Sequence, residues 1–170
     1  MIDSPQKPEH AAGRCIVGID YGRVRIGLAI ADRDSLPRPL VTLKRVNRNE
    51  DMRRLRELVR EHDVGHIVIG LPLRLDGTRG EMAEEATRFA TRIRKQLNVP
   101  VTMLDERLTS WEAERLLEEQ GGHFLRDAKA AHKKGKRETA RISVDAVAAA
   151  VILKEYLEQQ QVTKPTPEHI

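Results

Sequence analysis

Three acidic residues that lie far apart in the chain are the strongest candidates for a catalytic site. Asp20 ends an apolar run that begins at Cys15, Glu106 ends a similar run that begins at Val101, and Asp145 opens an alanine-rich stretch. Carboxylates at the ends of buried strands and at the start of a small-residue helix are costly to desolvate unless a cation holds them. Hard divalent ions prefer oxygen ligands of this kind. The pattern therefore indicates a carboxylate site for Mg²⁺ or Mn²⁺ that hydrolyses phosphodiester bonds.

Each of these acids also has an ordinary structural explanation. Asp20 could form a turn, Glu106 could pair with Arg107, and Asp145 could cap a helix. Because side chains alternate along a strand, only one of Asp105 and Glu106 can share a face with Asp20. Taken one at a time, the three acids leave both a catalytic and a structural role open.

The elements that must position these acids alternate between strands and helices. Hydrophobic periodicity predicts strands at 15–20, 25–31, 39–43, 66–70 and 101–106, and helices at 49–62, 81–97, 109–121 and from Asp145 to about Tyr156. Thr78 and Thr109 each precede a glutamate with capping-box spacing, and Ser143 is a candidate N-cap. The first three strands suit antiparallel pairing, whereas the later strand–helix units imply parallel pairs. We expect an α/β fold with a mixed five-stranded sheet and helices on both faces.

The length of 170 residues suits one domain with a sizeable core. We expect that domain at 14–158, with flexible tails at 1–13 and 159–170. The formal net charge is only +4, but residues 123–141 carry seven basic and two acidic side chains, a local charge of 7 − 2 = +5. This basic segment is either a flexible solvated loop or a surface for a polyanion.

Several function classes are disfavoured by the sequence. The single cysteine allows no disulfide framework, and no apolar run has the length of a membrane span, so we expect a cytoplasmic protein without membrane contact. The chain shows no Walker loop, nucleophile elbow or zinc-ligand spacing. Aromatic residues make up 3% of the chain, so any nucleic acid is expected to be contacted mainly at its phosphates.

Four motifs occur in an order that resembles the YqgF family, which also carries the name RuvX. They are DYGRVRIGLA at 20–29, IGLPLRLDGT at 69–78, LDERLT at 104–109 and DAVAAAVIL at 145–153. The resemblance covers about residues 14–158, and members of the family are described as Holliday junction resolvases or as pre-16S rRNA nucleases. It implies a ribonuclease H-like fold, related to RuvC-type resolvases, and a cytoplasmic nuclease that depends on a divalent metal. The segment between Gly122 and Asp145 looks longer than the family pattern, with an extra stretch around 128–136.

The resemblance also implies roles for particular residues. The acidic positions of the family fall on Asp20, Glu106 and Asp145, which would be both catalytic and metal-binding. The candidates for nucleic-acid contact are Arg25, Arg107, Thr109, Lys133, Lys134, Lys136 and Arg137.

The expected reaction is endonucleolytic 5′-end processing of precursor 16S rRNA during ribosome biogenesis, with the RNA or a ribosomal particle as partner. One alternative is a Holliday junction resolvase that acts on branched DNA. The other is a ribosome-assembly factor that binds RNA without cutting it. We expect a monomer or a weak homodimer.

Overall fold

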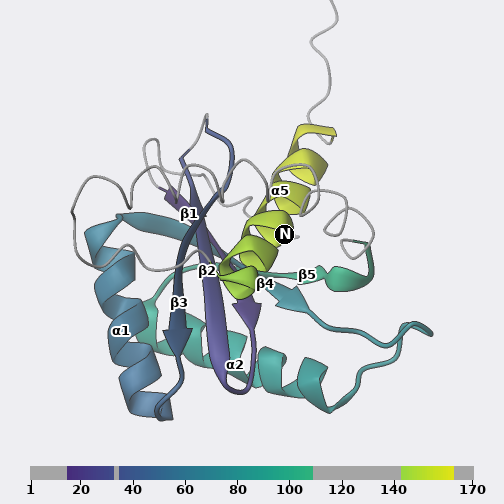
Figure 1. Cartoon of the computed structure of the whole chain (residues 1–170), viewed down its shortest axis with the longest axis horizontal. Coiled ribbons are helices and arrows are strands. Elements are labelled where there is room, and N and C mark those ends of the chain that lie inside the picture. Colours follow the sequence, from purple (N-terminus) through teal and green to yellow (C-terminus); the bar gives the residue numbers. More distant parts are fainter. Residues whose placement is uncertain (1–14, 33–34, 109–142, 163–170) are drawn as a thin grey trace, which may run out of the picture.

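The computed structural model describes residues 15–32, 35–108 and 143–162 (Figure 1). The strands are β1 (Cys15–Tyr21), β2 (Arg25–Ala31), β3 (Arg38–Lys44), β4 (Val64–Leu71) and β5 (Val101–Asp105). The helices are α1 (Arg48–Glu61), α2 (Glu81–Leu97) and α5 (Val144–Val162), with a 3-10 turn η1 at Glu106–Leu108. Each expected element within the described ranges is present. The last helix continues past the expected end near Tyr156, and the helix expected at 109–121 lies outside the described residues.

The five strands form one mixed sheet in the order β3-β2-β1-β4-β5. The pairs β1–β2 and β2–β3 are antiparallel, because only short connections join these strands. The pairs β1–β4 and β4–β5 are parallel, since α1 and α2 each carry the chain back to the end of the sheet at which the preceding strand began. The predicted mixed five-stranded sheet is confirmed.

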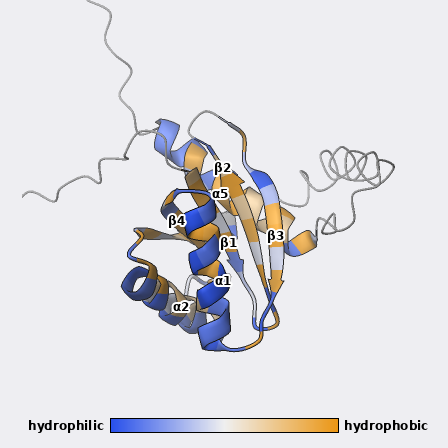
Figure 2. Cartoon of the chain, turned by 90° about the vertical axis from the view of Figure 1, so that its left-hand side faces the viewer, coloured by the Kyte–Doolittle hydropathy of each residue, from blue (hydrophilic) through white to orange (hydrophobic). Residues whose placement is uncertain are grey.

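Helices cover both faces of the sheet, as expected. Figure 1 shows α5 in front of the strands, and Figure 2 shows that α1 and α2 present mostly hydrophilic outer surfaces. The larger core cluster packs strand side chains against Met52 and Leu55 of α1 and Phe89 and Ile93 of α2. A second cluster, on the opposite face, joins Val68 and Leu104 of the strands to Ile152, Leu153 and Tyr156 of α5. The burial of alternate strand residues on two faces explains why the strands read as apolar throughout.

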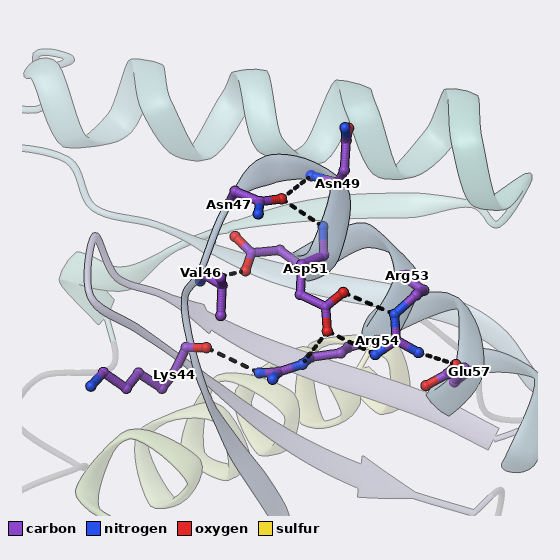
Figure 3. A network of polar contacts seen from close by, with 9 residues as sticks. Lys44, Val46, Asn47, Asn49, Asp51, Arg53, Arg54 and Glu57 are labelled. Carbon is purple, nitrogen blue, oxygen red and sulfur yellow. Dashed lines mark hydrogen bonds and ion pairs between the residues drawn. The ribbon is translucent and has the colours of Figure 1, made fainter.

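A buried ion pair connects the turn after β1 to the start of α1. Asn47 caps α1 by accepting hydrogen bonds from the backbone of Asn49 and Glu50, while the amide of Val46 donates to Asp51 (Figure 3). The guanidinium of Arg45 donates to Asp51 Oδ2 at 2.9 Å. It also donates to the Tyr21 hydroxyl at 2.8 Å and the Gly22 carbonyl at 3.2 Å. The turn that follows Asp20 is therefore fixed from the face of the sheet opposite α5.

The helix caps agree with the sequence in one case and differ in another. The predicted N-cap at Ser143 is confirmed, since its carbonyl accepts the Val147 amide at 3.1 Å and its Oγ accepts the Ala146 amide at 3.4 Å. The predicted capping box at Thr78 is wrong, because α2 begins after Gly80 without a side-chain cap. The Thr78 hydroxyl instead donates to Asp76 Oδ1 at 2.7 Å within the preceding loop. Thr109 lies outside the described residues.

Candidate active site

Glycines on the sheet allow α5 to approach the strands at backbone distance. A Cβ atom at Gly18 would lie 2.6 Å from the carbonyl oxygen of Ala149, and one at Gly27 would lie 1.9 Å from that of Asp145. Both distances are too short for any side chain larger than hydrogen. The first turn of α5, which carries Asp145, is therefore in direct contact with the middle of the sheet.

Asp20 lies on β1 directly opposite Gly27 of β2 in the antiparallel register. Paired residues share a face, so the Asp20 side chain lies on the α5 side of the sheet, beside the glycine that contacts Asp145. Burial, and then the negative charge of Asp145, raise the pKa of Asp20 to about 6. The two acids are thus close enough to repel each other, although 125 residues separate them in the chain.

Glu106 reaches the same face from the other side of the parallel strand pair. A Cβ atom at Gly70 of β4 would lie 1.9 Å from Glu106 Oε1, so the carboxylate lies directly over this glycine. The pKa of Glu106 is raised to about 7, mainly by burial and further by the negative charges of Asp20 and Asp105. The structure therefore brings Glu106 toward Asp20.

Asp105 and Glu106 part because the chain leaves the strand between them. β5 ends at Asp105, and Glu106 begins η1. Asp105 forms an ion pair with Arg107, at 2.6 Å from Nη2 to Oδ2, and this hydrogen bond lowers the pKa of Asp105. The expectation that only one of the two acids shares a face with Asp20 is thus resolved in favour of Glu106.

Asp145 carries a cation partner of its own. The Arg25 Nε donates to Asp145 Oδ2 at 2.7 Å, with 62% of the arginine side chain and 26% of the aspartate side chain exposed. Arg25, a predicted phosphate contact, therefore lies at the acidic group itself. Arg107 lies beside Glu106 and also contacts the loop after β4, where its Nη1 would be 3.0 Å from a Cβ atom at Gly77.

The residues fit a hard divalent cation by donor type and by charge. The negative charge of Asp145 raises the pKa of Asp20, and that of Asp20 raises the pKa of Glu106, so a nearby cation would relieve the cost of ionising both acids. In residues 15–32, 35–108 and 143–162, no three Asp, Glu, His or Cys side chains already form a cluster that could hold a metal ion. Binding through all three acids would therefore require a side-chain movement, and Asp145 is the acid that Arg25 holds.

The other predicted contacts with nucleic acid cannot be placed, because Thr109, Lys133, Lys134, Lys136 and Arg137 lie outside the described residues. Two features of the site were not predicted from the sequence. The first is that Gly27 and Gly70, which have no side chain, leave room for the backbone of Asp145 and the carboxylate of Glu106. The second is the ion pair between Arg25 and Asp145. The role of Gly27 could be inferred only from the strand register, which pairs this glycine of β2 with Asp20 of β1.

The chain is similar to a described protein family, to several proteins of known sequence and to a solved structure. The sequence profile described as "RuvX: Holliday junction resolvase" matches residues 14–159. A protein of Anaeromyxobacter sp. (strain K), named "Putative pre-16S rRNA nuclease", is 41% identical over 145 residues, covering 85% of this chain and 96% of that protein. A protein of the same name from Thermoanaerobacter pseudethanolicus is 34% identical over 147 residues, covering 86% and 97%.

The fold is also shared with a solved structure. The structure of T. thermophilus RuvC in complex with a Holliday junction substrate matches with a TM-score of 0.55 at 16% identity, covering 88% of this chain and 97% of that chain. This match confirms the expected ribonuclease H-like fold. In the part of the chain that the structure describes, no helix is long and apolar enough to cross a membrane.

Proposed function

Because this chain belongs to the RuvX (YqgF) family, we propose that it is a metal-dependent endonuclease that trims the 5′ end of precursor 16S rRNA in the cytoplasm. One observation carries the proposal: Asp20, Glu106 and Asp145 lie at one face of the sheet, and each raised pKa among them has a neighbouring acid as a cause. Stability alone does not explain such an arrangement, since partly buried carboxylates that repel each other destabilise a fold. The choice of precursor 16S rRNA as the substrate rests on the names of the relatives.

The three acids would hold Mg²⁺ or Mn²⁺ through their oxygens. When bound, such an ion lowers the pKa of water and offsets negative charge on the phosphate. Asp20 is fixed by its position in β1, and the carboxylate of Glu106 lies against Gly70 of β4, where there is no side chain. The backbone positions of these two acids are therefore fixed by the sheet, so that only side-chain movement would be needed to bring the carboxylates around an ion.

The arginines around the acids would bind the nucleic-acid backbone. Arg25 and Arg107 are both partly or largely exposed and lie on either side of the acidic group, with Arg25 at Asp145 and Arg107 beside Glu106. Guanidinium groups bind phosphate oxygens well but read no sequence when they contact the backbone alone. We expect recognition by the shape of a folded RNA and by charge, with strong salt dependence.

A second candidate function is resolution of four-way DNA junctions. Two findings favour it: the description of the family profile and the fold shared with a RuvC that binds a Holliday junction. A resolvase nicks two strands together and normally acts as a two-fold dimer. The same catalytic acids would serve either substrate, so the substrate has to be tested directly.

The experiment compares cleavage of a 16S precursor leader transcript with cleavage of a four-way DNA junction, each with Mn²⁺ or Mg²⁺. Asp20→Asn, Glu106→Gln and EDTA should abolish activity, whereas Asp105→Asn is the matched control that removes a neighbouring acid outside the site. Leader cleavage that only the first three changes remove supports the proposal. Symmetric junction cleavage without leader cleavage supports the resolvase instead. Binding of the leader without cleavage of either substrate supports an assembly factor.

A further inference from the structure

The cation that pairs with Asp145 is more exposed to solvent than the acid itself. Arg25 is the first residue of β2, and 62% of its side chain is exposed, against 26% for Asp145. The pair joins residues 120 positions apart in the chain. An exposed arginine has many alternative conformations, so this contact can open at low cost.

The acid cannot move away from the sheet in the same manner. Its carbonyl oxygen would lie 1.9 Å from a Cβ atom at Gly27, which places the helix backbone in contact with β2. The Ser143 hydroxyl is in hydrogen-bond contact with Thr42 Oγ1 of β3 and also caps the helix. The start of α5 is therefore tied to two strands, which fixes the backbone of Asp145, whereas the Arg25 side chain is largely exposed.

The neighbouring arginines do not share this position. Arg23 pairs with Glu81 at 3.0 Å and with Glu85 at 2.7 Å, both in the first part of α2. Arg107 pairs with Asp105, which the structure turns away from the acidic group. Of these three arginines, Arg25 alone has one of the candidate metal ligands as its partner.

We propose that Arg25 is a placeholder for the metal: its guanidinium supplies the positive charge beside Asp145 while the metal is absent, and it leaves Asp145 when the metal binds. The ion and the guanidinium compete for the carboxylate of Asp145. When the ion displaces Arg25, the side chain becomes available to a backbone phosphate of the nucleic acid. This inference rests on the proposed function, because it requires that the three acids bind a divalent ion.

The exchange makes metal and nucleic acid bind cooperatively. In the metal-free protein, Asp145 neutralises Arg25 and so weakens its attraction for phosphate. In the metal-bound protein the arginine is released, so the affinity for nucleic acid rises. By thermodynamic linkage, nucleic acid must strengthen metal binding by the same factor.

The test measures Mn²⁺ binding to the whole chain by titration calorimetry, without nucleic acid, for the wild type, Arg25→Gln and Arg23→Gln. Removal of the competing cation should tighten Mn²⁺ binding by Arg25→Gln about two- to fivefold, the range expected for a partly exposed ion pair. Arg23→Gln removes the same charge from the adjacent turn and should bind Mn²⁺ like the wild type. The melting temperatures of all three proteins confirm that each is folded.

A second measurement follows the affinity for a fluorescent leader-RNA hairpin, by anisotropy, in EDTA and in Mn²⁺, with intact RNA verified on a gel. Mn²⁺ should strengthen binding by the wild type and by Arg23→Gln, and do so less for Arg25→Gln. Weaker or unchanged Mn²⁺ binding by Arg25→Gln would overturn the placeholder, and so would equal tightening by Arg23→Gln. If Mn²⁺ fails to bind the wild type at all, the metal site of the proposed function fails, and the placeholder with it.

Discussion

Replacing Asp20 by Asn should make the metal-free protein more stable at neutral pH, although the residue is a candidate catalytic acid. The pKa of Asp20 is raised from its ordinary value of 3.8 to about 6 by burial and by Asp145. A difference of about two between the pKa values of the folded and unfolded states corresponds to about 3 kcal/mol of free energy. This is an upper limit, because Asp20 keeps some solvent contact and an amide also has to be desolvated. We expect Asp20→Asn to stabilise the protein by about 1–3 kcal/mol, or roughly 2–10 °C in Tm.

The pH dependence of this gain distinguishes charge from packing. Below pH 3.8 the wild-type carboxyl is protonated in both the folded and the unfolded states, so the variant gains nothing from the lost charge. Between about pH 4 and pH 6 the folded state holds a proton that the unfolded state has released, so wild-type stability falls as the pH rises. Above about pH 6 the cost is fully present. The advantage of Asp20→Asn should therefore grow from pH 4 to pH 6 and then level off.

The assay is thermal or urea unfolding in EDTA across pH 4 to 8, with Asp105→Asn as the matched control. The hydrogen bond from Arg107 lowers the pKa of Asp105, so this control should lose only a little stability relative to the wild type at neutral pH, and that loss should disappear as the pH falls. Excess Mn²⁺ should raise the Tm of the wild type and leave Asp20→Asn nearly unchanged. The reasoning is refuted if Asp20→Asn is less stable than the wild type at pH 7.5 in EDTA, or if its advantage is equal at pH 4 and pH 7.5.

Three further changes should have distinct effects. Gly27→Ala should destabilise the protein by about 1–3 kcal/mol and reduce cleavage, because the new methyl group would displace the backbone of Asp145; unfolding and cleavage assays measure the two losses. Asp51→Ala should cost about 3–5 kcal/mol in urea unfolding, since it removes the acidic partner of Arg45, and the side chains of Asp51 and Arg45 are only 4% and 18% exposed. Arg107→Gln should weaken RNA binding and reduce the slope of affinity against salt concentration by about one, with little change in Tm; an unchanged slope would exclude a phosphate contact.

Much of the fold follows from local patterns in the sequence. Apolar runs of strand length, separated by amphipathic helices, were enough to predict the mixed sheet, because short connections give antiparallel pairs and helical crossovers give parallel ones. The position of Asp20 and Glu106 at or just beyond a strand end was equally visible. The resemblance to the RuvX family rested on four motifs, and the match of the family profile to residues 14–159 confirms the family.

The parts that sequence reasoning missed depend on contacts between distant or competing groups. The pair of Arg25 and Asp145 spans 120 positions and arises only when α5 packs on β2. The prediction of a helix cap at Thr78 was wrong because the Thr78 hydroxyl donates to the carboxylate of Asp76, two residues earlier. The first outcome cannot be inferred from the spacing of residues along the chain, whereas the second is a local competition between two hydrogen-bond partners of Thr78.

The most direct test of the central claim is a crystal structure of the protein with Mn²⁺, using anomalous scattering to locate the ion. We expect a peak bound by the carboxylates of Asp20 and Glu106, with Asp145 as a further ligand and Arg25 turned away from it. The same experiment on Asp20→Asn should show a weaker peak or none. A wild-type crystal at saturating Mn²⁺ with no peak between these acids, or with the ion held by other residues, would contradict a metal-dependent nuclease site here.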